Sequence, residues 1–213
     1  MYQPHPSRIL TELFARRPYQ GVPPETAKFL FVGLDANYAA DIERSPIFPA
    51  LLAYHEDGPA FWCKYGVHHP FLLPAYAGDG RRYHRTFAKI GFRPEHANLV
   101  SFAELLHVPT VGRSSLIPTD LDSIHLRRLS AAIFAGQAEY IFLSAGVVRL
   151  MLATHQFPKL GEPRASSGSL RTLFKDSART VFLHLHFSNY GKFEAQLQAE
   201  ARDIGALLHL GDG

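Results

Sequence analysis

Two polar groups capable of hydrolytic chemistry follow apolar runs in this sequence. Asp35 comes just after the run Phe29–Val32, and His186 ends a second run that begins at Thr180. A carboxylate can orient a water molecule or stabilise positive charge, and an imidazole can donate a hydrogen bond to a leaving group. Held close together, the two groups could hydrolyse a bond that leaves positive charge on one fragment and negative charge on the other as it breaks.

The apolar runs predict strands that are covered on both faces, as in a mainly parallel sheet with helices on each side. Four segments have this character: Lys28–Gly33, Ala97–Leu106, Tyr140–Ser144 and Thr180–His186. Ligands of such sheets bind beyond the carboxyl ends of the strands, where Asp35 and His186 would meet if their strands are close. Gly33 would let the backbone turn or another group approach closely.

Segments with helical spacing separate or follow these runs. They are Ser7–Arg16, Tyr83–Ile90, Ser123–Phe134, Gly146–His155 and a last helix in which Phe193, Leu197, Ala201, Ile204 and Leu208 form an apolar stripe. In the last helix we expect Lys192, Glu194, Glu200 and Arg202 to face water. The alternation predicts a three-layer α/β/α fold with a central, mainly parallel four-stranded sheet.

The length of 213 residues and the lack of a linker-like segment predict one domain over residues 1–213. Residues 1–27 would form an N-terminal helical extension, and residues 38–82 a long, aromatic-rich loop region. A second irregular stretch is expected at Phe157–Asp176, where Arg164 and Ser166 are among the cations and hydroxyls suited to phosphate contact.

Composition narrows the class of protein. The chain is 46% hydrophobic and 19% charged, and neither a membrane span nor a secretory signal is evident, so we expect a soluble cytoplasmic protein. Cys63 is the only cysteine, which excludes an intramolecular disulfide and a cysteine-ligated iron–sulfur cluster. A net charge of +3 is compatible with a polyanionic partner without requiring one.

The ordered motifs of the chain resemble those of the uracil-DNA glycosylase superfamily. The segment Gly33-Leu34-Asp35-Ala36-Asn37-Tyr38 is similar to its GQDPYH or GINPG motif, and His186-Phe187-Ser188-Asn189-Tyr190 to its HPSPL or NPSGL motif. Between them, GVHHPFLLPAYAGDGRRYHRTFAKIGF and FAELLHVPTVGRSSL resemble the mismatch-specific uracil/thymine branch. The resemblance covers about residues 28–208. It departs from the family at Ala36 and Phe187, where proline is usual, and at Glu104, where that branch has asparagine, which leaves the preferred base open.

The resemblance implies a monofunctional DNA glycosylase of base excision repair that flips a uracil, or another deaminated or mispaired base, out of DNA. Asp35 would position water and His186 would hydrogen-bond the leaving base. The base pocket would comprise Gly33, Asn37, Tyr38, Phe71 and Glu104. The DNA contacts would be Ser188, Asn189, Tyr190, Lys192, Arg164 and Ser166. The resemblance implies no cofactor or metal, a monomer, and a cytoplasmic location, at the nucleoid in a bacterium or in the nucleus of a eukaryote.

Two other functions fit the same residues. A metal-dependent hydrolase could use His184, His186, His68, His69 and Asp35 as nitrogen and oxygen ligands. A non-catalytic nucleic-acid-binding module could keep the fold without the activity, because a fold does not by itself imply a function.

Overall fold

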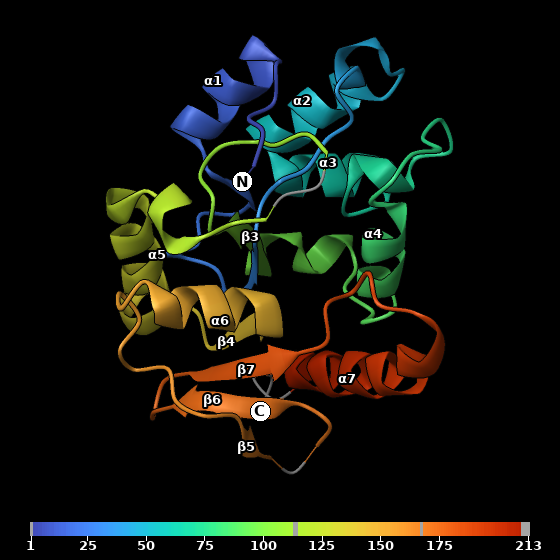
Figure 1. Ribbon diagram of the computed structural model, residues 1–213. Helices are drawn as coiled ribbons and strands as arrows, with labels where there is room; N and C mark the ends of the chain where they lie inside the picture. Colours follow the sequence, from blue (N-terminus) through green and yellow to red (C-terminus); the bar gives the residue numbers. More distant parts are fainter. Residues whose placement is uncertain (1, 113–114, 167, 210–213) are drawn as a thin grey trace.

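The protein is an α/β protein built on one mixed, seven-stranded sheet. The computed structural model describes residues 2–112, 115–166 and 168–209 (Figure 1). The strand order is β1-β3-β2-β4-β7-β6-β5. The strands are β1 (Tyr19–Gly21), β2 (Phe29–Gly33), β3 (Val100–Glu104), β4 (Tyr140–Ser144), β5 (Arg164–Ala165), β6 (Arg171–Lys175) and β7 (Thr180–His184).

The sheet corrects the prediction of four strands. The four apolar runs do form β2, β3, β4 and β7, which are parallel neighbours, but antiparallel strands extend the sheet at both sides. The hairpin of β5 and β6 lies inside Phe157–Asp176, which the sequence predicted to be irregular. Strands β1 and β5 are short, and β6 buries only Leu173, so these outer strands leave no apolar run in the sequence.

The helices cover the sheet and extend beyond one edge. The α-helices are α1 (Arg8–Arg16), α2 (Phe48–Glu56), α3 (Gly58–Tyr65), α4 (Arg81–Ala88), α5 (Ser123–Ala135), α6 (Ala145–Ala153) and α7 (Glu194–Ala206). Short 3-10 turns are η1 (Ile42–Arg44), η2 (Pro70–Leu72), η3 (Pro94–Leu99), η4 (Pro118–Asp120), η5 (Gly191–Phe193) and η6 (Leu207–His209). None of the helices in the described ranges has both the length and the apolarity needed to cross a lipid bilayer.

Helices α2 and α3 correct the prediction of a long loop over residues 38–82. Asp57 begins α3 as an N-cap that accepts a hydrogen bond of 2.9 Å from the backbone of Ala60, and Gly66 ends it with a positive φ of 68°. These caps are visible in the sequence. The helices were missed because aromatic side chains occur around them without the single apolar stripe that marks a surface helix.

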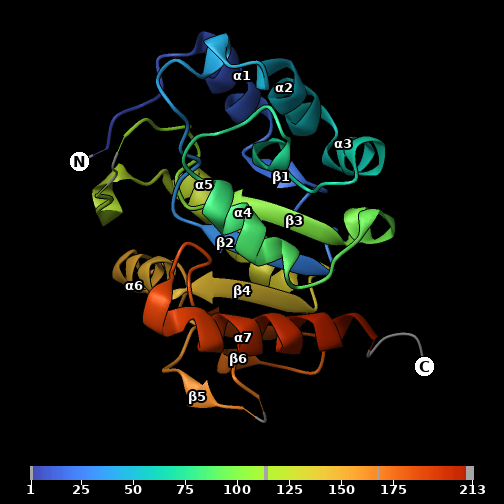
Figure 2. The same ribbon diagram turned by 90° about the vertical axis from the view of Figure 1, so that its right-hand side faces the viewer.

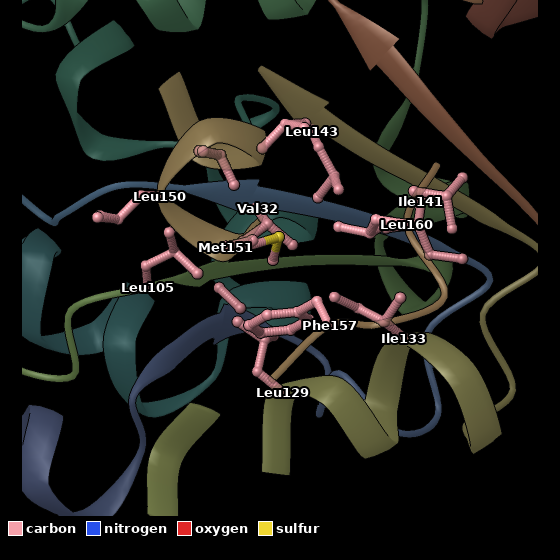
Figure 3. Packing of buried hydrophobic residues seen from close by; sticks show 14 of the residues in the cluster. Val32, Leu105, Leu129, Ile133, Ile141, Leu143, Leu150, Met151, Phe157 and Leu160 are labelled. Atoms are coloured by element: carbon pink, nitrogen blue, oxygen red, sulfur yellow. The ribbon is translucent and has the colours of Figure 1, made fainter. Parts of the chain in front are cut away.

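Each face of the sheet packs against its own pair of helices. On one face, Val32 and Ile141 contact the side chains of α5 and α6, including Leu129 and Met151 (Figure 3). Helices α4 and α7 cover the other face (Figure 2). An aromatic layer of the sheet that includes Phe31 packs against them. Because both faces are covered, the strand ends are where polar groups can reach solvent.

Glu200 corrects the expectation that the acidic side chains of the last helix face water. Its carboxylate is buried and accepts hydrogen bonds from the backbone N–H of Leu185, at 2.7 Å, and from Gln196, at 2.8 Å. Burial raises the pKa of this carboxyl group. Leu185 directly precedes His186. The hydrogen bond therefore joins the end of β7 to α7 and fixes the position of the backbone at His186.

Candidate active site

Three titratable side chains meet beyond the carboxyl ends of the parallel strands, and we call Asp35, Glu104 and His186 the strand-end cluster. Glu104 ends β3 in register with Gly33 of β2, and Asp35 follows two residues later. His186 follows β7, which is separated from β2 by β4, so the two strands lie about 10 Å apart. The charge of Asp35 acts across this gap, because it raises the pKa of Glu104 and opposes the lowering of the pKa of His186.

Glu104 is held as a neutral acid. Burial, and then the negative charge of Asp35, raise the pKa of the Glu104 carboxyl group to about 8. Its Oε2 atom is buried and has no hydrogen-bond partner in the described part of the chain. At neutral pH the group can therefore donate one hydrogen bond and accept another, as an amide side chain does.

Gly33 makes room for this carboxyl group. A Cβ atom at Gly33 would lie 2.0 Å from Oε2 of Glu104, well inside the contact distance of the two atoms. The sequence predicted that Gly33 lets another group approach the backbone closely, and this group is the side chain of Glu104. A larger residue at this position would displace Glu104.

A relay of hydrogen bonds orients Asp35. The hydroxyl of Thr110 donates to Oδ2 of Asp35, and the amide of Asn37 donates to Thr110 Oγ1 at 3.0 Å and to the carbonyl of Gly112 at 2.5 Å. Backbone bonds from Thr110 to Ala36, at 2.9 Å, and from Tyr38 to Thr110, at 3.0 Å, hold the same segment. Asn37 thus supports Asp35, and its amide is already engaged within the protein.

We expect Thr110→Val to weaken this support. Thr110 is fully buried, and valine keeps its shape while removing the hydroxyl that joins Asn37 to Asp35. Leaving such groups unpaired costs about 1–3 kcal/mol of the free energy of unfolding. Urea denaturation measures the loss, and Thr110→Ser, which restores the hydroxyl, should recover part of it. A valine variant as stable as the unaltered protein, together with a loss in the serine variant, would show that the methyl group, not the relay, matters.

His186 presents one ring nitrogen to the outside. Its Nδ1 lies 2.6 Å from Ser188 Oγ and accepts a hydrogen bond of 3.3 Å from the backbone N–H of Ser188. Nδ1 is therefore an acceptor, and the neutral ring carries its proton on Nε2. The atoms packed around the ring lower the pKa of His186, and the charge of Asp35 opposes this effect. A neutral donor at Nε2 results.

Tyr38 and Phe71, predicted to line a base pocket, are buried in one cluster of the core. The hydroxyl of Tyr38 accepts a hydrogen bond of 2.9 Å from Gln20, and burial, with a further contribution from Glu104, raises its pKa. One face of the Phe71 ring is covered by Tyr76, with the ring centroids 4.2 Å apart. Phe71 therefore has at most its other face for stacking on a ligand.

The residues predicted to contact DNA fall into two groups. Ser188, Asn189, Tyr190 and Lys192 lie in the segment between β7 and α7, next to His186. In contrast, the strand β5 that holds Arg164 is the outermost strand, two places beyond β7, and Ser166 follows it. The Ser166 hydroxyl donates to the carbonyl of Leu170 at 2.5 Å. The structure does not bring these last two residues to the strand-end cluster.

The histidines proposed above as metal ligands lie mostly in the core. The rings of His69 and His84 are stacked at 3.6 Å, and His68 hydrogen-bonds His84 at 3.1 Å. His184 packs against Phe187, and burial lowers the pKa of both His68 and His184 to about 3. Within residues 2–112, 115–166 and 168–209, no group of three or more His, Cys, Asp or Glu is arranged to hold a metal ion.

Sequence reasoning missed two residues at this site. Thr110 lies in the VPT segment, whose resemblance to a family motif was noted without a role. Tyr83, at the first turn of α4, lies with its ring centroid 5.3 Å from that of His186, and burial followed by the charge of Glu104 raises its pKa. Nothing in the sequence distinguishes this tyrosine from a core aromatic residue.

Phe187 and Ala36, where the chain departs from the motifs that it resembles, have structural roles. Phe187 is fully buried and packs against Tyr83 and Phe87, so the second motif is anchored by an aromatic ring in place of a proline. Ala36 is also buried, and its carbonyl accepts the backbone hydrogen bond from Thr110. Neither substitution removes a polar group from the cluster.

No protein-family model matches the sequence, and neither does any curated protein.

Proposed function

We propose that this protein is a DNA glycosylase of the uracil-DNA glycosylase type, which hydrolyses the N-glycosidic bond of a deaminated or mispaired base. The proposal rests on the motifs around Asp35 and His186, and on one observation above all. A carboxylate, a neutral imidazole and a neutral carboxyl group face the same strand-end region, and these groups match the charges that develop in this reaction.

Asp35 acts on the sugar side of the bond. As the bond between C1′ and the base breaks, C1′ becomes positive, and a carboxylate nearby stabilises this charge. Asp35 also orients a water molecule, whose oxygen bonds to C1′ and whose proton is released to the carboxylate or to solvent. The relay through Thr110 and Asn37 keeps the carboxylate in one orientation for both tasks.

His186 and Glu104 act on the base side. The bonding electrons leave with the base, and the Nε2–H of His186 hydrogen-bonds the carbonyl oxygen on which the negative charge develops. The neutral carboxyl group of Glu104 offers a donor and an acceptor to the edge of the base. An edge in which a carbonyl adjoins an N–H, as in uracil or hypoxanthine, complements this pair.

The wider assignment follows from the same proposal. The segment Ser188–Lys192 contacts the DNA flanking the flipped nucleotide, and Tyr38 and Phe71 form the inner wall of the base pocket. We propose that the protein acts as a monomer in base excision repair, in the cell compartment that holds the DNA.

Base release from defined oligonucleotides tests this proposal. The substrates are matched strands that contain uracil, thymine opposite guanine, hypoxanthine or no lesion, each single-stranded and in duplex, with EDTA present. Alkali cleavage then reports abasic product. Product from a lesion-containing strand alone supports the proposal and identifies the base. Binding to every strand without product would favour the non-catalytic module, and activity only after a divalent metal is added would contradict the mechanism.

A further inference from the structure

A groove with one basic wall lies between α4 and the segment that leads into α7, and we call it the α4 groove. It encloses about 460 Å³. Its lining consists of Arg82, Arg85 and Thr86 from α4 with its C-cap Lys89, Asn189, Tyr190 and Gly191 from the segment that leads into α7, and Glu194, Leu197 and Gln198 from α7 itself. The strand-end mechanism uses none of the α4 cations.

The cations of α4 form a row on the side of the helix that lines the groove. Arg82, Arg85 and Lys89 are exposed and recur at three- and four-residue intervals, so they lie along one side of the helix. At about 1.5 Å per residue, they extend over roughly 10 Å, enough to contact successive phosphates of an extended strand. Glu194 is the single acid in the lining, so the groove keeps a positive balance.

An exposed aromatic ring completes the groove. Tyr190 is 67% exposed, although it is a large aromatic residue, and the guanidinium group of Arg82 lies 4.3 Å from the centre of its ring. Arg82 holds the ring in place by a cation–π contact and leaves much of the ring surface in solvent. Grooves that bind single strands combine cations along the backbone with such rings, on which the bases stack.

Residues next to the α4 groove contact the strand-end cluster. Tyr83 of α4 contacts His186, and Asn189 and Tyr190 follow His186 directly in the chain. A strand lying in the groove would therefore pass beside the strand-end cluster.

We propose that the α4 groove binds single-stranded DNA, with its phosphates on Arg85 and Lys89 and a base stacked on Tyr190. The inference rests on the proposed function and extends it by assigning its partner: the protein takes the nucleotide from a single strand in preference to a duplex. An unpaired strand exposes its bases to Tyr190, whereas the bases of a duplex are stacked within it.

Salt-dependent binding tests the assignment. The probe is a fluorescent 20-nucleotide oligothymidylate without lesions, and anisotropy gives its Kd between 50 and 300 mM salt. Each phosphate contact to a single strand contributes about 0.7 to the slope of log K against log salt, so Arg85→Gln/Lys89→Gln should reduce the slope by about 1.4. Tyr190→Ala should weaken binding by roughly 5- to 150-fold, and Tyr190→Phe should not.

The matched control is Arg127→Gln/Lys175→Gln, which removes two exposed cations from α5 and β6. An unchanged slope for this control supports the groove. Equal slopes for both double variants would overturn the proposal that the α4 groove binds single-stranded DNA, as would tighter binding to a duplex of the same length. Circular dichroism and thermal melting establish that each variant is folded.

Base release, measured on the same proteins, separates the two proposals. If the salt slope falls only in Arg85→Gln/Lys89→Gln but the protein releases no base, the proposed glycosylase activity is contradicted, and the proposed binding of a single strand in the α4 groove is not. If the protein releases base but the salt slope is the same in both double variants, only the proposed binding of a single strand in the α4 groove is contradicted.

Discussion

We expect Asp35→Asn to slow base release by about 10²- to 10⁴-fold, the usual contribution of a positioned acid or base. The substitution removes the negative charge that, in the proposed mechanism, stabilises C1′ and orients water, while an oxygen remains to accept the hydrogen bond from Thr110. Single-turnover kinetics with saturating protein isolate the chemical step from product release. DNA affinity, measured on a lesion-free strand, should change much less than the rate.

The control for Asp35→Asn is Asp41→Asn. Asp41 is exposed, lies six residues further along the same segment, and makes no side-chain hydrogen bond to the turn that it precedes. It should leave the rate unchanged. If Asp35→Asn released base as fast as the unaltered protein, Asp35 would have no catalytic role, and the mechanism above would be wrong.

The second large effect concerns Glu104, which should make the free energy of unfolding fall as the pH rises. Its carboxyl group has an ordinary pKa of 4.5 in the unfolded chain and a pKa of about 8 in the folded protein. Between these values the folded state binds more protons than the unfolded state, so a rise in pH favours unfolding, by up to about 1.4 kcal/mol per pH unit. Paired carboxylates behave in the opposite way.

Glu104→Gln isolates this effect, because glutamine is neutral at every pH and keeps nearly the same shape. The free energy of unfolding of the variant, minus that of the unaltered protein, should rise steadily from pH 4.5 to pH 8. Urea denaturation at four pH values measures it, and all other titrating groups cancel in the difference. A constant difference would mean that Glu104 is ionised in the folded protein.

The same variant has a catalytic readout. Above pH 8 the unaltered protein loses the donor of Glu104 as the carboxyl group ionises, so recognition of a base carbonyl should weaken. Glu104→Gln keeps a donor and an acceptor and should lose less of its activity between pH 7 and pH 9. If both proteins lost equal activity between pH 7 and pH 9, the loss would be due to a titrating group other than Glu104.

The sequence predicted the parts of the fold that rest on long apolar patterns. The four runs became the four parallel strands, and the helices at Ser7–Arg16 and Ser123–Phe134 are present within one or two residues. It also indicated that Asp35 and His186 lie at strand ends, because a buried strand that stops at a polar residue has few alternatives. These features depend on local order along the chain.

The parts that failed depend on contacts between distant segments. Glu200 occupies the polar side of its helix by spacing alone, and only the folded chain shows that it accepts the N–H of Leu185. The neutral state of Glu104 likewise results from burial and from Asp35, two effects that no motif contains. The sequence predicts a loop over residues 48–65 because the helices α2 and α3 are apolar on more than one side.

The short strands at the two sides of the sheet protect the chain against self-association. An open strand edge offers unpaired N–H and C=O groups to a second molecule, and apolar parallel strands would be hazardous in that position. Here β1 has three residues and β5 has two, and β5 carries the charge of Arg164. Strand β1 covers the edge of β3, and the hairpin of β5 and β6 covers the edge of β7, so losing this hairpin would expose β7 and favour aggregation.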